Sequence, residues 1–406
     1  MKAEVILKEV LKNYVPSNEE VLKIKKLADF YVNKLKKEKL NVFIGGSLAK
    51  DTLVKKDIQD VDIFVLFDKE ENTLRLESSL KKLKLDFKKV HGSRDYFQIK
   101  DEEILFEIIP VVKVEKPETA GNVTDFSLIH VNYIKKKIAK NKKLADEIRL
   151  AKIFCYAQNC YGAESYIQGF SGYSLELLIC YFGSFMKFLK GIQKKRIIDS
   201  EKFFKNDKKI LSELNESKLL APVILIDPTY KYRNVCAGLS KETFERFLEF
   251  SKKFIAKPSL NFFEKKKIDI ESIKALAKKK KGKYFELFFS TEKQEGDIAG
   301  TKMRKFFEFI ISELERKGQK VLFKEFNYSG EKIAEAHLII NEKKEVEIKG
   351  PPVANKKALT GFRKARKKIY FKNGFAFTKE KINVKDIILF VKRFEEEMGV
   401  RLENFN

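Results

Sequence analysis

The chain has few of the side chains on which several common kinds of metal and redox chemistry depend. Only four cysteines occur in 406 residues, and they form neither a CxxC pair nor the spacing of a disulfide framework. This usage fits free thiols in a reducing compartment and argues against cysteine-bound zinc. Only three histidines are present, so a catalytic histidine cluster is poorly supported. We therefore expect carboxylates to hold any metal ion.

Long apolar runs are also missing. The N-terminal segment MKAEVILKEVLKNYV mixes charges into a helical pattern and lacks the apolar centre of a signal peptide. No later stretch approaches the roughly 18 uninterrupted apolar residues of a membrane span. These absences predict a cytoplasmic protein with no membrane partner.

Positive charge, in contrast, is abundant. Eighty-four Lys and Arg against 58 Asp and Glu leave a net charge of +26. A field of that sign attracts polyanions, so nucleic acid is the first partner to consider. The alternative is a lysine-rich proteome, in which lysine accumulates at solvated positions without a binding role. With 44% hydrophobic residues, the chain can also bury the cores of two or three domains.

The first part of the chain reads as a small α/β unit with a mixed sheet. Ser17 and Glu20 form a capping-box pattern at the start of the second of two amphipathic helices. The expected helices cover 2–14, 18–38, a short stretch from Ser47 and a polar stretch over 69–84. The expected strands cover 41–46, 61–67, 96–100 and 104–112, and the last two form a hairpin around Asp101 and Glu102.

The periodicity changes twice beyond this unit. Long helical patterns over about 125–255 predict a helical middle domain. After Pro258 and the lysine run 278–281, strands and helices alternate in a β-α-β-β-type order with aromatic strands. That order is typical of RNA-recognition-like, ferredoxin-like folds, although many α/β sandwiches share it. We expect a multidomain α+β protein with a catalytic head over 1–124, a helical neck over 125–257 and an α/β RNA-binding body and tail over 258–406.

The sequence GGSLAKDTLVKKDIQDVDIFVLF (45–67) contains the candidate active site. Asp60 and Asp62 are two apart at the start of an apolar strand, so their carboxylates point to the same face. Such close like charges are tolerated when a divalent cation bridges them, and carboxylate-held Mg²⁺ is what phosphoryl transfer needs. Gly45 and Gly46 let the backbone approach a ligand, and Ser47 begins a helix that offers groups to phosphate oxygens.

A third carboxylate is expected from a neighbouring strand. Glu107 is the one charged residue in the apolar run from Ile104 to Val112. The alternative is that Asp60 and Asp62 only begin a strand and that Glu107 lies on its solvated face. The turn, the spacing and the third acid occur together, and this combination favours a metal site.

Further segments extend the pattern into the middle of the chain. These are YGAESYIQGFSGYSLELLICYFGSF (161–185), IDPTYKYRNVCAGLS (226–240) and PSLNFF (258–263). With the head motif, they make residues 1–265 resemble the archaeal, class I CCA-adding enzymes, which belong to the polymerase β-type nucleotidyltransferases. The C-terminal part resembles them more loosely, through its pattern and GPPV (350–353). The family adds C, C and A to the 3′ end of tRNA without a nucleic-acid template.

The resemblance implies a role for each candidate residue. It makes Asp60, Asp62 and Glu107 the metal-binding triad. It also implies a nucleotide site formed by Gly46, Ser47, Lys50, His130, Lys152, Tyr161 and Arg233. Within that site Ser47 and Lys50 would contact the triphosphate, the next three would hold ribose and phosphates, and Arg233 would help to select C or A.

This sequence also departs from the family at several of these positions. The family usually has Glu then Asp in the strand pair, Asp as the third acid and Arg in place of Lys50. Each departure preserves the charge but changes the distance from the backbone to the charged group. Taken alone, His130, Lys152 and Tyr161 fit structural roles equally well, and Arg233 fits a surface ion pair.

The expected activity is therefore Mg²⁺-dependent CCA addition from CTP and ATP to tRNA, gripped at its acceptor and T arms. A poly(A) polymerase or oligoadenylate synthase with the same head is one alternative. A catalytically inactive RNA-binding protein of this fold is another. The sequence leaves both a monomer and a homodimer open.

Overall fold

The structure is a computed structural model, which describes residues 3–56, 58–92, 94–114, 121–265, 269–292, 294–366 and 368–406. The chain forms two compact units, Met1–Lys266 and Lys267–Asn406. Within the described residues, no helix is long and apolar enough to cross a membrane.

The N-terminal unit begins with a five-stranded mixed sheet in the order β1-β2-β5-β4-β3. Its strands are β1 (Asn41–Ile44), β2 (Gln59–Phe67), β3 (Lys88–Val90), β4 (Tyr96–Asp101) and β5 (Ile104–Val112). Strands β2 and β5 run parallel, while the pairs β1/β2, β3/β4 and β4/β5 are antiparallel. The mixed sheet and the hairpin of β4 and β5 confirm the expectation from the sequence.

Helices accompany this sheet at the positions that the sequence predicts. They are α1 (Ala3–Tyr14), α2 (Asn18–Lys37), α3 (Gly46–Ala49), the 3-10 helix η1 (Glu70–Leu74) and α4 (Arg75–Lys82). Lys2, where the first helix was expected to begin, lies outside the described residues. The capping box of Ser17 and Glu20 is present at the start of α2. Apolar residues that alternate along β2, such as Val61, Ile63 and Val65, are fully buried.

The second half of this unit is mainly helical. Its helices are η3 (Val123–Phe126), α5 (Ser127–Lys140), α6 (Lys143–Ala157), α7 (Gly172–Phe182), α8 (Phe185–Gly191), α9 (Asp207–Glu213), α10 (Glu216–Leu219), α11 (Lys241–Ala256) and η4 (Leu260–Phe262). Phe154, Phe185, Phe247, Phe254 and Phe263 are all buried in one aromatic cluster at its centre. The expected helical middle domain is therefore present.

A small sheet interrupts the helices of this region, and the helical periodicity did not predict it. Its strands are β6 (Ile197–Ile198), β7 (Ile224–Asp227) and β8 (Tyr230–Asn234). All four residues of β7 are buried. A strand covered on both faces is a short, continuous apolar run, which a helical core segment resembles in sequence. Asp227 ends this run, and Arg233 lies on the next strand.

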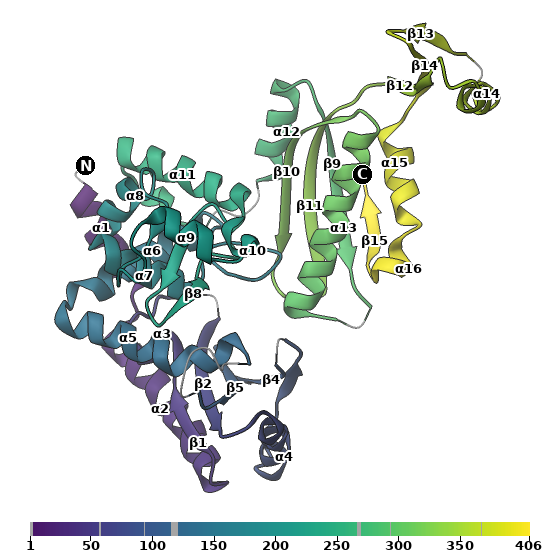
Figure 1. Cartoon of the computed structure of the whole chain (residues 1–406). Helices are drawn as coiled ribbons and strands as arrows, with labels where there is room; N and C mark the ends of the chain where they lie inside the picture. Colours follow the sequence, from purple (N-terminus) through teal and green to yellow (C-terminus); the bar gives the residue numbers. More distant parts are fainter. Residues whose placement is uncertain are drawn as a thin grey trace. The chain divides into compact units, whose positions relative to one another are not determined.

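The C-terminal unit contains a four-stranded antiparallel sheet in the order β10-β11-β9-β15. Its strands are β9 (Lys283–Ser290), β10 (Lys320–Tyr328), β11 (Ile333–Asn341) and β15 (Arg401–Phe405). Helix α13 (Gly296–Arg316) packs on one face through Phe306 and Phe307 against Phe289 (Figure 1). Helix α12 (Ile270–Lys279) packs its buried Ile273 near one end of the sheet, together with Ile339.

The remaining elements of the unit form an inserted module and a C-terminal segment. The module contains β12 (Glu345–Pro352), α14 (Lys356–Lys364), β13 (Tyr370–Lys372) and β14 (Phe375–Lys381), with sheet order β12-β14-β13 (Figure 1). The helix expected over 384–398 is divided into α15 (Val384–Lys392) and α16 (Glu395–Met398). Gly399 then turns the chain at φ +63° into β15.

Candidate active site

The Gly-Gly-Ser turn lies against the first residues of β2. Gly46 has φ +56°, and a Cβ atom added there would lie 1.7 Å from Oδ2 of Asp62. Glycine at this position thus allows both a left-handed backbone and a close approach of the turn to the carboxylate. Ser47 follows in the first turn of α3, with its side chain partly exposed.

The three candidate metal ligands lie on neighbouring strands. Asp62 of β2 is directly opposite Glu107 of β5, and Asp60 is two residues earlier on β2. The parallel pairing therefore brings the three acids to one face of the sheet. Burial, followed by repulsion from Asp60, raises the pKa of Asp62. Burial and the charge of Asp62 likewise raise the pKa of Glu107 to about 7.

Two polar neighbours hold these acids in place. Lys56 Nζ donates to Asp60 Oδ2 at 2.6 Å, and Gln98 Nε2 donates to Glu107 Oε1 at 2.8 Å. Burial lowers the pKa of Lys56, but Tyr161 and Asp60 outweigh it and raise it overall. Lys56 Nζ also lies 5.5 Å from the ring centre of Tyr161. Lys56 therefore supplies part of the positive charge that this acidic face requires.

The donor set fits a hard divalent cation. All three candidate ligands are carboxylates, which suit Mg²⁺. Burial, followed by repulsion between the acids, raises the pKa of Asp62 and of Glu107, and a cation would oppose both effects. Among the described residues, a group of three side chains whose possible metal-binding atoms all lie within 4.8 Å of one another occurs in the C-terminal unit, at Glu286, Glu335 and His337. The triad is more open, because Lys56 and Gln98 each bind one of its acids.

A buried ion-pair network joins the α3 region to the helical part of the unit. Glu176 of α7 is fully buried and accepts from Lys50 Nζ at 2.7 Å and from Lys152 Nζ at 2.8 Å. Lys152 also donates to Thr52 Oγ1 at 2.9 Å. Burial lowers the pKa of Lys152 to about 8, while Glu176 opposes that shift. Burial alone would raise the pKa of Glu176, but its two lysines outweigh burial and lower it.

A second polar cluster surrounds Asp227 at the end of β7. His130 Nε2 lies 3.1 Å from Asp227 Oδ2, and Arg233 Nη1 donates to the same oxygen at 2.8 Å. Tyr173 Oη donates to Asp227 Oδ1 at 3.2 Å, and its ring stacks on His130 at 4.0 Å. Burial would raise the pKa of Asp227, but His130 and Arg233 lower it to about 2. Burial lowers the pKa of His130, which favours a neutral imidazole at pH 7.

These clusters are electrostatically connected. Lys50, Lys56 and Lys152 each act to lower the pKa of Asp62. The positive charge of Lys50 also acts to lower the pKa of His130. The charge of Lys50 therefore acts on both the acidic strand pair and the cluster around Asp227.

The prediction from the sequence missed the partners of these residues, namely Lys56, Thr52, Gln98, Tyr173, Glu176 and Asp227. Two of them carried a usable signal. Glu176 is the only charged residue in YSLELLICYF, and Asp227 ends the apolar run VILID. A lone acid in an apolar run is the same signal that identified Glu107.

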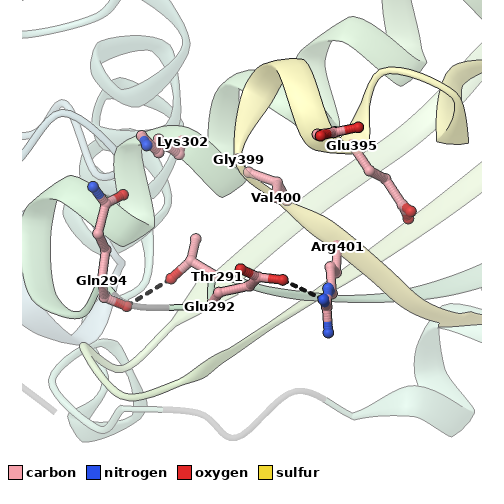
Figure 2. A pocket seen from close by; sticks show the side chains of 9 residues that line it. Thr291, Glu292, Gln294, Lys302, Glu395, Gly399, Val400 and Arg401 are labelled. Carbon is pink, nitrogen blue, oxygen red and sulfur yellow. Dashed lines mark hydrogen bonds and ion pairs between the residues drawn. The ribbon is translucent and has the colours of Figure 1, made fainter.

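A separate cavity of about 560 Å³ lies in the C-terminal unit (Figure 2). Its lining residues are Thr291, Glu292, Gln294, Lys302, Glu395, Glu396, Gly399, Val400 and Arg401. Arg401 pairs with Glu292, and Thr291 Oγ1 donates to the backbone carbonyl of Gln294 at 2.6 Å, as Figure 2 shows. None of the sequence-predicted site residues lines this cavity.

Comparison with known proteins gives a consistent family. A nucleotidyltransferase domain model matches residues 24–145, and a model of the second domain of tRNA nucleotidyltransferases matches residues 146–264. The CCA-adding enzyme of Nanoarchaeum equitans is 36% identical over 76% of both chains. That of Methanocaldococcus jannaschii is 30% identical over 92% of this chain and 87% of its own. The chain belongs to the CCA-adding enzymes. It is a tRNA nucleotidyltransferase.

Solved structures confirm the fold of the N-terminal part of this CCA-adding enzyme. A cytoplasmic RNA terminal U-transferase aligns with a TM-score of 0.51 and 14% identity, over 66% of this chain and 100% of that one. The Cid1 poly(U) polymerase with Mg and 3′-dATP bound aligns with a TM-score of 0.51 and 12% identity, over 65% and 99%. The polymerase β-like head and the helical second domain are therefore as expected.

Replacing Glu176 by Gln should strongly destabilise the N-terminal unit. The amide would leave Lys50 and Lys152 buried without the charge that balances them, and losing one partner of a buried ion pair costs about 3–5 kcal/mol. Urea unfolding followed by circular dichroism would measure the change. The matched control is Glu249→Gln, which breaks an exposed pair with Lys253 and should change stability little. Equal stability of the two variants would contradict a charged Glu176.

Replacing Gly46 by Ala should impair nucleotide incorporation without unfolding the protein. The new methyl group meets Asp62 Oδ2, so the turn or the carboxylate must move by more than an ångström. Displacements of that size in an active site cost about 10²-fold in rate. The rate of a single CMP addition measures the effect, and Gly121→Ala, where a Cβ meets nothing within 4 Å, is the control. An unchanged rate in Gly46→Ala would separate this turn from the active site.

Proposed function

We propose that this CCA-adding enzyme transfers CMP and AMP from CTP and ATP to the 3′ end of tRNA at a Mg²⁺ site made by Asp60, Asp62 and Glu107. When bound, Mg²⁺ supplies positive charge that lowers the pKa of the attacking 3′-hydroxyl and neutralises the triphosphate, and pyrophosphate is released. The observation that carries the proposal is the registered pair Asp62 and Glu107, with Asp60 two residues away. Their raised pKa values support a site that gains a cation during its work.

The triphosphate would be bound between the Gly-Ser turn and the buried lysines. Ser47 offers its hydroxyl at the first turn of α3, beside the backbone of Gly46. Lys50 and Lys152 are oriented by Glu176, so their charges are held in place before the nucleotide arrives. Groups fixed in this way need little reorganisation when phosphate charge develops. Tyr161, beside Lys56, would close the same side of the site.

Base selection would use the cluster around Asp227. Arg233 presents a planar guanidinium whose Nη1 is fixed by Asp227, which leaves its other donors for a base edge or a tRNA phosphate. His130 and Tyr173 stack beside it and form a flat, partly apolar wall. A neutral His130 would orient Arg233 through Asp227 without adding a second charge.

The C-terminal unit would bind tRNA. We infer a ferredoxin-like core from the element order β9-α13-β10-β11, then α15-β15, with the module β12–β14 inserted. Helix α14 and the residues after it carry a basic run of Lys356, Lys357, Arg363, Lys364, Arg366 and Lys368. Basic residues of this kind bind phosphates without reading sequence, as expected for a protein that must accept every tRNA. The boundaries of head, neck and body near residues 124 and 257 remain part of this proposal.

The decisive experiment uses tRNA that lacks its last three nucleotides. Purified protein with Mg²⁺ and radiolabelled CTP and ATP should extend it by C, C and A and then stop. UTP alone should give no extension, which separates this activity from that of a terminal uridylyltransferase. Extension by long A tracts would favour the poly(A) polymerase alternative, and no extension would favour an inactive RNA-binding protein.

Glu107 tests the metal site most directly. Glu107→Gln keeps the shape and the contact with Gln98 but removes the charge, so single-turnover CMP addition should fall by roughly 10²–10³-fold. Glu107→Asp should keep part of the activity, because the charge remains on a shorter side chain. CTP affinity should change little in both variants. Glu103→Gln, an exposed acid in the same hairpin, is the control. Full activity of Glu107→Gln would remove Glu107 from the metal site.

Arg233 tests base selection. Arg233→Lys keeps the positive charge near Asp227 but loses the fork of donors, so discrimination between CTP and UTP should weaken more than tRNA affinity does. Competition between the two nucleotides at the first addition measures discrimination, and a filter-binding titration measures tRNA affinity. Arg316→Lys, at an exposed position, serves as the control. A loss of tRNA affinity with unchanged discrimination would make Arg233 a phosphate contact only.

A further inference from the structure

The four-stranded sheet of the C-terminal unit carries a polar cluster on one face. Phe285, Leu287 and Phe289 of β9 are buried on the face that α13 covers. Side chains alternate along a strand, so Glu286 of β9 points to the opposite face. His337 of β11 is directly opposite Glu286, and Glu335 lies two residues earlier on β11. Three potential metal ligands are therefore grouped on two paired strands.

The geometry of this cluster is compact. Donor atoms of Glu286, Glu335 and His337 all lie within 4.8 Å of one another. His337 Nε2 is 3.1 Å from Glu335 Oε1, and His337 Nδ1 is 3.9 Å from Glu286 Oε1. His337 is 0% exposed, whereas the two carboxylates are partly buried. A partly open site of this kind admits an ion from solvent.

Tyr284 fixes which nitrogen of the imidazole carries a proton. Its hydroxyl donates to Glu286 Oε1 at 3.3 Å and lies 2.8 Å from His337 Nδ1. A hydroxyl that donates its one proton to Glu286 can only accept from Nδ1, and in that arrangement Nε2 keeps a lone pair for a metal ion.

The other ring nitrogen of His337, Nε2, lacks a hydrogen-bond partner among the described residues. This atom is also buried. Glu335 Oε1 is close at 3.1 Å, but the contact lacks hydrogen-bond geometry. In the neutral ring, two lone pairs would face each other across this short distance, which is unfavourable unless a positive charge lies between them. Either a proton on Nε2 or a metal ion meets that need.

We propose that Glu286, Glu335 and His337 bind one divalent transition-metal ion, with His337 Nε2 and the two carboxylates as ligands. One imidazole and two carboxylates favour ions of the Zn²⁺ class over Mg²⁺, which prefers oxygen alone. The bond from Nδ1–H to Tyr284, and from Tyr284 to Glu286, resembles the outer contacts that orient metal-binding histidines. Three protein ligands leave a further position for water. This site is separate from the proposed Mg²⁺ site and does not depend on the catalytic proposal.

The test is a Zn²⁺ titration of the full chain, with wild type and single variants compared. Zn²⁺ bound by the N-terminal unit contributes equally in wild type and in every variant. The difference in Zn²⁺ stoichiometry between wild type and a variant therefore gives the number of ions bound at the C-terminal cluster. Wild type should bind one more equivalent than Glu335→Gln or Glu286→Gln. Tyr284→Phe should keep the site but weaken it by about 10–100-fold, the usual cost of losing an outer contact. Glu345→Gln, an exposed acid at the start of β12 in the same unit, should behave as wild type.

Thermal unfolding and Co²⁺ binding complete the experiment. Unfolding without metal checks that each variant is folded, and Zn²⁺ should raise the melting temperature of wild type more than that of Glu335→Gln. Co²⁺ should give visible absorption bands that the same variant lacks. Equal Zn²⁺ stoichiometry in wild type and in both ligand variants would overturn the proposal and make His337 a protonated partner of Glu335. A response to Mg²⁺ but not to Zn²⁺ would overturn the assignment to the transition metals.

Discussion

A single buried carboxylate organises the active region of this protein. Glu176 forms ion pairs with Lys50 and Lys152, and its charge opposes the lowering of the pKa of Lys152 by burial. Lys50 follows α3 and Lys152 lies on α6, so the same contact joins the nucleotidyltransferase head to the helical neck. Because Glu176 already fixes these two ammonium groups, a ligand that binds them does not bear the conformational entropy cost of ordering flexible surface lysines. The proposed triphosphate site is therefore held by residues from both matched domains.

Around that contact, opposite charges alternate through the site. Asp62 lies among three lysines that lower its pKa, yet burial and Asp60 keep the pKa raised overall. The three acids thus keep an excess of negative charge over their direct partners. Lys56 contacts Asp60, whereas Glu107 is contacted only by the neutral amide of Gln98. In the proposed function, a bound divalent cation would supply the remaining positive charge.

The sequence was sufficient to predict the parts of the fold that local pattern controls. The alternation in β2, the capping box before α2 and the apolar run of β5 are short-range signals, and each predicted its element correctly. The role of the lone acid in β5 as a metal ligand stays a prediction. It predicted less well wherever distant segments decide the outcome. The pairing of β15 with β9 and the burial of β7 depend on neighbours far along the chain. Lys56, Asp227 and Glu176 were missed for the same reason, because their partners are set by the tertiary fold.

The proposed C-terminal metal site does not follow from composition. Three histidines in 406 residues suggested that carboxylates would carry any metal ion, and that expectation considered histidines only as a cluster. His337 needs no second histidine, since strand pairing places it beside Glu286 and Glu335. Tyr284, two residues from Glu286 on the same strand, contacts both Glu286 and the Nδ1 atom of His337. The proposal therefore rests on a single histidine buried between acids and not on the number of histidines in the chain, because burial makes an unsatisfied nitrogen costly.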